Sequence, residues 1–118
     1  MLKLPLEGNF SPRCLMEKYT PHYDLAVIKA DVRRLGRKAF TWTANECGQD
    51  LGFSIEEMQT VIYELQNRML YKSMTTHRDH RIWQDVYHTH SKDREIYIKV
   101  TYRTDGRPPV ISFKEKTP

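Results

Sequence analysis

Five polar side chains in the second half of this sequence have the chemistry that breaking a ribose phosphodiester requires. That reaction needs a group to take the proton of the 2′-hydroxyl, positive charge beside the phosphate oxygens, and a proton for the leaving 5′-oxygen. A tyrosine among lysines suits proton transfer, because positive charge lowers the phenol pKa. Lysines can counter phosphate charge, and a glutamine can bind a base edge or a phosphate oxygen. The alternative is that all five are solvated residues of a sheet surface. They are Lys72, Gln84, Tyr97, Lys99 and Lys114.

Four histidines in the same half follow the spacing His77-x2-His80-x7-His88-x-His90. Imidazoles gathered across a hairpin can bind zinc, but no cysteine lies nearby and the spacing is not that of a familiar zinc finger. We therefore expect independent loop histidines, with no metal and no cofactor. A histidine that transfers protons on RNA is the alternative.

Several common catalytic motifs are missing. The sequence has no G-x-x-x-x-G-K or G-x-G-x-x-G phosphate-binding loop and no G-x-S-x-G nucleophile turn. Cys47 has no sequence context typical of a nucleophile, so we interpret it as a core or near-core residue. These absences leave the polar residues of the second half as the best candidates for chemistry.

The elements that would position those residues are strands. After Gln66 the apolar period changes from 3.6 to 2, and short links between successive strands favour antiparallel pairing. The predicted strands are Leu70–Thr75, Ile82–Tyr87, Glu95–Tyr102 and Val110–Glu115, linked by 77–81, 88–94 and 103–109.

Alternation along the third of these strands separates two faces. Ile96, Ile98 and Val100 lie on the side expected to be core, whereas Tyr97 and Lys99 lie on the other. In the first strand, alternation places Lys72 on the same side as the apolar residues Leu70 and Met74. Lys72 is therefore either at the rim of the core, with its stem buried and its charge in solvent, or a functional residue. Trp83 and Tyr87 share one side with Asp85; we expect core packing, with nucleobase stacking as the alternative.

Helices are predicted in the first half. One begins at Thr20-Pro21 and ends at Gly36. Residues 39–42 are interpreted as a short strand. Thr43–Glu46 and Ser54–Glu57 have the pattern of capping boxes that open two further helices. The predicted fold class is therefore α+β, with N-terminal helices packed on a C-terminal antiparallel β-sheet.

Length and composition favour one cytoplasmic globular domain. The chain has 118 residues, 39% of them hydrophobic, with no apolar run of the ~18 residues that a membrane span needs. Residues 1–15 show no signal-peptide pattern and are interpreted as a flexible leader or a misassigned start, followed by a single domain over 16–118. Two cysteines, 33 residues apart, favour reduced thiols.

Positive charge is concentrated in the strand-forming half. Residues 68–118 contain 11 Lys and Arg against 6 Asp and Glu, within a chain of net charge +4. This asymmetry favours a polyanionic partner for the predicted sheet.

Long stretches of the chain resemble the motility quorum-sensing regulator toxins, the MqsR family. The resemblance covers roughly 16–116 and begins with Met16-Glu-Lys-Tyr-Thr-Pro-His22. Its other motifs are Tyr71-Lys-Ser-Met-Thr-Thr76, Trp83-Gln-Asp-Val-Tyr87, Ile96-Tyr-Ile-Lys99 and Val110-Ile-Ser-Phe-Lys-Glu-Lys116.

The resemblance implies a RelE-like toxin fold and the activity of an endoribonuclease. Members of this family are toxins of type II toxin–antitoxin pairs that cut single-stranded mRNA at GCU-like sequences. The implied partner is an antitoxin with a zinc-binding N-terminal part and a helix-turn-helix DNA-binding part. DNA contact would then be indirect, through the antitoxin, and zinc would belong to the partner.

The resemblance also carries four catalytic positions onto this chain. They are Lys72, Gln84, Tyr97 and Lys114, which coincide with the polar set found from residue chemistry. We further expect Lys99, His80 and Arg81 to contact RNA. His77, His88 and His90 fall outside the family pattern.

Two other hypotheses stay open at this point. A non-catalytic nucleic-acid-binding regulator would need the basic residues but has no use for a tyrosine and a glutamine fixed among them. A histidine metal protein would need the four imidazoles to converge. Metal-independent cleavage of RNA is the first hypothesis.

Overall fold

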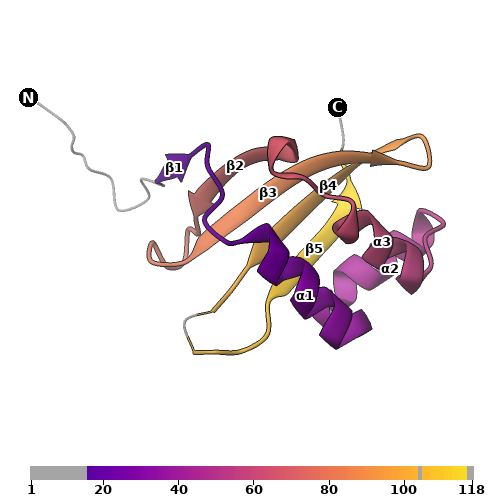
Figure 1. The fold of residues 1–118 in the computed structure, drawn as a ribbon, viewed down its shortest axis with the longest axis horizontal. Helices are drawn as coiled ribbons and strands as arrows, with labels where there is room; N and C mark the ends of the chain where they lie inside the picture. The colour runs from indigo at the N-terminus through magenta and orange to yellow at the C-terminus, as the bar shows by residue number, and fades with distance from the viewer. Residues whose placement is uncertain (1–15, 104, 117–118) are drawn as a thin grey trace, which may run out of the picture.

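The computed structural model describes residues 16–103 and 105–116, so the predicted leader 1–15 lies outside the described part. The described chain forms one antiparallel sheet with three α-helices against it, which confirms the predicted α+β class (Figure 1). Strand order follows the chain, β1-β2-β3-β4-β5. The strands are β1 (Glu17–Lys18), β2 (Leu70–Thr75), β3 (Trp83–Ser91), β4 (Arg94–Thr101) and β5 (Val110–Glu115).

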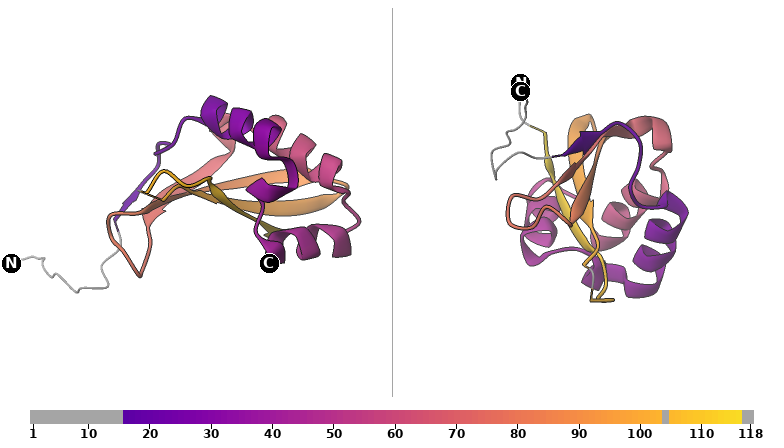
Figure 2. Two further views of the ribbon diagram at one scale, coloured as in Figure 1. Left: turned by 90° about the horizontal axis from the view of Figure 1, so that it is seen from below. Right: turned by 90° about the vertical axis from the view of Figure 1, so that its left-hand side faces the viewer.

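The helices do not all cover the same part of the sheet. Figure 2 shows α1 (Leu25–Leu35) and α3 (Ile55–Tyr63) against one face, and α2 (Trp42–Asp50) beside the outer strand β5. Phe40, just before α2, forms an isolated parallel bridge with Ile111 of β5. On the opposite face, α2 borders the sheet at β5, since Thr43, Ala44 and Cys47 line a small pocket with Tyr97 and Lys99. The rest of that face, which we call the open face, carries no helix of the described chain, and the candidate site lies there.

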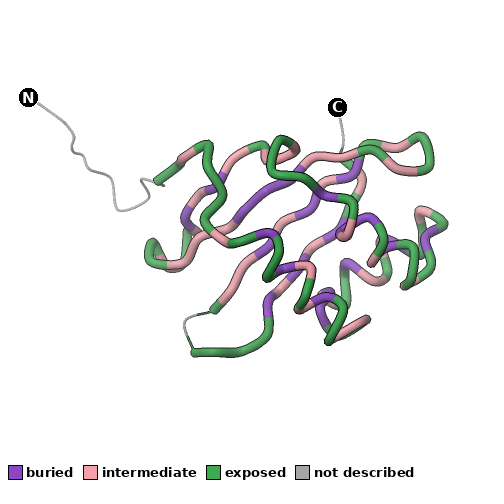
Figure 3. The backbone as a smooth tube through the Cα atoms, viewed as in Figure 1, coloured by how far each residue is buried: buried purple, intermediate pink, exposed green. Residues whose placement is uncertain are grey.

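The core lies between the central strands and the helices, and buried segments run along β3, β4 and β5 (Figure 3). On the helix side, Ile28, Met58 and Ile62 are fully buried. On the sheet side, Ile96, Ile98 and Val100 of β4 have no exposed surface, which confirms the predicted core face. In the described part of the chain, no helix is both long enough and apolar enough to span a bilayer.

The strand predictions were accurate at β2 and β5 and too short at β3. The link between β3 and β4 is a two-residue turn, Lys92-Asp93, in which both residues have positive φ, 53° and 61°. Such a turn matches the twist of the strands it joins. The predicted link 88–94 was therefore wrong, because β3 continues to Ser91 and carries His88 and His90 as strand residues.

A β-bulge in β2 corrects the prediction for Lys72. Leu70 pairs with Tyr87 but Lys72 pairs with Val86, so Tyr71 is the additional residue. The bulge leaves Leu70 packed against the core and moves Lys72 to the opposite, open face. Lys72 therefore does not share the core-facing side of the strand with Leu70.

The first helix begins later than predicted. The N-cap of α1 is Asp24, whose side chain accepts a hydrogen bond from the Ala26 N–H at 2.9 Å. The residues just before it bind elsewhere, because the backbone N–H groups of His22 and Tyr23 donate to the buried carboxylate of Asp85 on β3. This contact holds the chain in a bent, non-helical path past Thr20-Pro21. Gly36, with φ of 59°, ends the helix as predicted.

The segment between α1 and α3 also differs from prediction. Residues predicted as a strand, 39–42, instead span the end of a 3₁₀ helix (Gly36–Ala39) and the start of α2. The N-cap of α2 is Thr41, which accepts from the Ala44 N–H at 2.9 Å, so the capping box predicted at Thr43 was wrong. The box at Ser54 and Glu57 is confirmed, with both reciprocal hydrogen bonds present.

Candidate functional site

One row of side chains crosses the open face of the sheet. In the register of the strands, His88 of β3 is opposite Tyr97 of β4, and Tyr97 is opposite Lys114 of β5. Tyr71, from the bulge in β2, extends the row on the other side, since its ring stacks on the His88 imidazole. The register thus brings two predicted catalytic residues, Tyr97 and Lys114, into direct proximity.

Aromatic contacts fix this row. The Tyr71 and His88 rings stack with centroids 4.5 Å apart and an interplanar angle of 15°, and the His88 and Tyr97 centroids lie 5.5 Å apart. The ammonium of Lys114 lies 5.0 Å from the centre of the Tyr97 ring, within the range of a cation–π contact. His88 therefore sits between two tyrosines, with a lysine at the end of the row.

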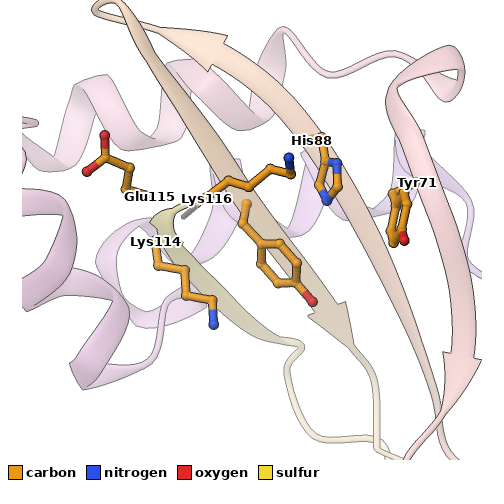
Figure 4. A pocket seen from close by; sticks show the side chains of 6 residues that line it. Tyr71, His88, Lys114, Glu115 and Lys116 are labelled. Atoms are coloured by element: carbon orange, nitrogen blue, oxygen red, sulfur yellow. The ribbon is translucent and has the colours of Figure 1, made fainter. Parts of the chain in front are cut away.

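A pocket of about 530 Å³ opens along this row, which we call the Tyr97 pocket. Figure 4 shows how Tyr71, His88, Lys114 and Lys116 surround it, while the carboxylate of Glu115 points away. Glu115 instead pairs with Arg94 at 3.2 Å. The side chains that face the pocket are thus aromatic or basic.

The protonation states in the pocket differ from the sequence prediction. Burial raises the pKa of the Tyr97 phenol, and the opposing charge of Lys72 does not reverse the shift. The predicted lowering by a nearby lysine is present, but burial of the ring on the packed sheet outweighs it, so the pKa of Tyr97 is raised and not lowered. Burial and then the charge of Lys116 lower the pKa of His88 below the ordinary 6.5. At neutral pH, Tyr97 keeps its proton and the His88 imidazole is uncharged.

One nitrogen of His88 has no hydrogen-bond partner. Its Nε2 is enclosed, and none of the residues in 16–103 and 105–116 binds it. Among the described residues, no hydrogen bond at Nε2 therefore fixes the tautomer of this ring. A neutral imidazole can donate one proton and accept another.

Lys72 reaches the same face but is already paired. Its Nζ lies 2.8 Å from the carboxylate of Glu17 on β1, and this hydrogen-bonded pair raises the pKa of Lys72. Lys72 also lies 5.5 Å from the centre of the Tyr71 ring. Lys72 thus lies beside the Tyr97 pocket, and its positive charge is balanced by the carboxylate of Glu17.

Gln84 and Lys99 face a different pocket. Gln84 pairs with Thr101, four residues beyond Tyr97 on β4, and both Gln84 and Lys99 line a second pocket of about 650 Å³. Thus the open face carries all four predicted catalytic residues, but Tyr97 and Lys114 line one pocket, Gln84 lines another, and Lys72 lines neither.

The remaining predicted RNA contacts lie in the loop between β2 and β3. The guanidinium of Arg81 binds the Asp79 carboxylate at 2.9 Å and is largely exposed. His80 is exposed as well. The structure does not bring either side chain into the two pockets described above.

Sequence reasoning missed three residues of the Tyr97 pocket: Tyr71, His88 and Lys116. The signal for His88 was that His88 and His90 continue the two-residue alternation of β3. The prediction ended this strand at Tyr87 and so missed it. Within the described residues, no three potential ligands among His, Cys, Asp and Glu gather as a metal site would require.

Comparison with known proteins agrees with this arrangement. The family model described as the motility quorum-sensing regulator, toxin of MqsA, matches residues 20–115. The mRNA interferase toxin MqsR of Escherichia coli (strain K12) is 41% identical over 101 residues, which are 86% of this chain and 100% of the relative. The family match spans all three α-helices and, apart from Lys116, the lining of both pockets. The α+β arrangement is consistent with the RelE-like fold that the motifs implied. The chain belongs to the motility quorum-sensing regulator toxin family.

Proposed function

We propose that this protein is a toxin that halts translation by cleaving single-stranded mRNA. The observation that carries the proposal is the row of His88, Tyr97 and Lys114 in one pocket of a basic sheet face. Its relative from Escherichia coli is named as an mRNA interferase toxin, which supports the same substrate class here. The preference for GCU-like sites remains part of the proposal.

The proposed reaction is attack by the 2′-oxygen on the neighbouring phosphorus. A bond forms between that oxygen and phosphorus, the bond from phosphorus to the 5′-oxygen breaks, and the products carry a 2′,3′-cyclic phosphate and a 5′-hydroxyl. The proton of the 2′-hydroxyl goes to a base in the pocket, and the leaving oxygen receives one from an acid. Hydrolysis of the cyclic phosphate would leave a 3′-phosphate.

The pocket contains residues suited to each part of this reaction. His88 is the neutral group that can take a proton at pH 7, because its pKa is lowered. Tyr97 retains its hydroxyl proton and can donate it to the phosphate or to the leaving oxygen. Lys114, with Lys72 beside the pocket, stabilises the charge that develops on the phosphate oxygens. This scheme uses no metal ion.

The proposed partner is a cognate antitoxin. The matching family model describes its members as toxins of MqsA. We propose that the antitoxin combines a zinc-binding N-terminal part with a helix-turn-helix part, so this chain contacts DNA only through it. A toxin that acts on mRNA would work in the cytoplasm.

A non-catalytic nucleic-acid-binding regulator is the alternative. Binding alone would explain the basic residues of the open face. It would not require a tyrosine hydroxyl and an uncharged imidazole in one pocket with lysines, since neither carries the charge that attracts phosphate. The site therefore favours cleavage.

The test is cleavage of a defined single-stranded RNA by purified protein in the presence of EDTA. We expect fragments with 5′-hydroxyl ends, and we expect a 2′-deoxy substitution at the cleaved nucleotide to block the reaction at that position. Cleavage that needs added divalent metal, or that continues past the 2′-deoxy position, would contradict the mechanism. Binding without cleavage would favour the regulator.

A further inference from the structure

Three adjoining pockets form one groove along β4 and β5. The Tyr97 pocket and a smaller pocket of about 280 Å³ share Tyr97 and Lys114. The smaller pocket in turn shares Lys99 and Ser112 with the 650 Å³ pocket that contains Gln84. Because each pocket shares lining residues with the next, the three pockets adjoin in a row from Lys114 to Gln84, and this row is what we call the groove.

The far end of this groove, which we call the Gln84 pocket, has the components of a nucleotide site. Arg78 and Arg103 line it, and no carboxylate among the described residues pairs with either. Its two acidic residues are occupied, since Asp79 binds Arg81 and Asp105 binds Arg107, each at 2.9 Å. The pocket therefore presents unpaired positive charge, which suits a phosphate.

The rest of the Gln84 pocket suits a nucleobase. Ile82 and Val110 supply apolar surface, and Thr101 and Ser112 supply hydroxyl groups. The Gln84 amide has a donor and an acceptor side by side, which is the pattern that reads a base edge.

The strand register separates Gln84 from the reaction centre. Gln84 is opposite Thr101, four residues beyond Tyr97 along β4. At ~3.3 Å per residue, the two backbone positions lie roughly 13 Å apart along the strand. Sites on different nucleotides of one strand can be separated in this way, whereas groups acting on one proton must come within about 3 Å of it.

We infer that the Gln84 pocket binds a nucleotide next to the cleaved one, with Gln84 reading its base edge and Arg78 and Arg103 holding its phosphate. Gln84 is then a specificity-determining residue, and the catalytic groups are those of the Tyr97 pocket. The RNA strand runs along β4 and β5, with Lys99 and Ser112 between the two positions. This inference rests on the proposed function, because it takes single-stranded RNA as the ligand.

The first test measures cleavage preference. A pool of RNA with randomised sequence is cleaved, and the new 5′-hydroxyl ends are sequenced, for the parent and for Gln84→Ala. We expect the variant to lose preference at one position beside the cut, by roughly tenfold. The matched control is Gln49→Ala, since Gln49 is exposed on α2 and lines none of the three pockets. A large fall in kcat with unchanged preference would overturn the inference and place Gln84 in the chemistry.

A second test does not depend on cleavage. Short single-stranded RNA oligomers that differ at one base are titrated into the Tyr97→Phe variant, and binding is followed by fluorescence anisotropy. We expect Gln84→Ala to remove discrimination between oligomers, and Arg103→Ala to weaken binding of every oligomer alike. If the parent binds RNA selectively but never cleaves it, the proposed function fails while base reading by Gln84 stands. Selectivity that survives Gln84→Ala would overturn the inference.

Discussion

Glu17 holds Lys72 in an ion pair, with 2.8 Å between the carboxylate oxygen and Nζ. The two residues lie on β1 and β2, which pair antiparallel. Lys72 is one of the four predicted catalytic residues, yet its positive charge is balanced before any substrate arrives. An RNA phosphate and the Glu17 carboxylate would compete for the same ammonium group.

The competition predicts that Glu17→Gln strengthens RNA binding. Removing the carboxylate leaves Lys72 free to attract phosphate, and a partly exposed ion pair is worth up to about 1 kcal/mol. We expect KM to fall by up to about fivefold, with a steeper dependence on salt. The measurement is the initial cleavage rate at several RNA and salt concentrations.

The control for that variant is Glu56→Gln, on the exposed surface of α3. It makes the same change of net charge, so it separates a local effect at Lys72 from a general gain in positive charge. A fall in cleavage on Glu17→Gln would show instead that Glu17 positions Lys72 for the reaction.

A second prediction concerns the hydroxyl of Tyr97. Tyr97→Phe keeps the ring that contacts His88 and Lys114 and removes only the O–H group. Loss of one group that stabilises a transition state commonly costs roughly 10²–10³ in rate. We expect a fall of that size in kcat with little change in the midpoint of thermal unfolding. Lys114→Ala in the same background should cost less than it does alone, because residues of one catalytic unit are not additive.

The matched control is Tyr63→Phe, which removes a hydroxyl from α3 on the helix side of the sheet. We expect it to cleave RNA like the parent. If Tyr97→Phe also cleaves at the parental rate, Tyr97 neither donates a proton nor stabilises the phosphate.

The pH dependence of cleavage follows from two opposite pKa shifts. The pKa of His88 is lowered below 6.5, so the imidazole is neutral at pH 7 and becomes protonated only under more acidic conditions. The pKa of Tyr97 is raised above the ordinary 10.0, so its hydroxyl keeps its proton through neutral and mildly basic pH. We expect kcat/KM to be flat from about pH 7 to 9 and to fall below pH 6.5 as the proton acceptor is lost.

His88→Gln tests the assignment of the acidic limb. The variant keeps a polar side chain of similar length but cannot titrate, so we expect a lower plateau and no fall in kcat/KM below pH 6.5. His90→Gln is the control, because His90 is exposed on the same strand and lies outside the Tyr97 pocket. If kcat/KM of His88→Gln still falls below pH 6.5 as it does in the parent, the fall is due to the protonation of another group.

The sheet was predictable because its signals are local. Alternation fixes which side of a strand each residue takes, so Ile96 and Tyr97 were placed on opposite faces correctly. The bulge at Tyr71 was not predictable, because it depends on Leu70 packing into the core on one side and Lys72 reaching Glu17 on the other. Strand alternation alone places these two residues on one face.

The site was predicted in its residue types but not in its grouping. Tyr97 and Lys114 meet because of a register that no residue pattern specifies. His88 joins them only because the Lys92-Asp93 turn lengthens β3. The beginning of α1 was misplaced for a similar reason: Asp85, distant in sequence, binds the backbone that precedes the helix.

The last prediction concerns that buried carboxylate. Asp85 has no exposed surface and accepts hydrogen bonds from the Ser73 hydroxyl at 2.6 Å and from the backbone N–H groups of His22 and Tyr23 at 3.0 and 2.9 Å. It therefore joins the segment before α1 to the centre of the sheet. Asp85→Ala would leave these donors without a partner, and each buried unsatisfied group costs about 1–3 kcal/mol.

We expect Asp85→Ala to lower the free energy of unfolding by roughly 3 kcal/mol or more, a large part of the ~5–15 kcal/mol that a domain has. Asp85→Asn retains one carbonyl oxygen as acceptor and should lose less, while Ser73→Ala removes a single donor and should cost about 1 kcal/mol. Urea unfolding followed by circular dichroism measures all three, with Asp50→Ala on the surface of α2 as the control. If Asp85→Ala is no less stable than that control, the contact does not anchor the segment, and the late beginning of α1 must have another cause.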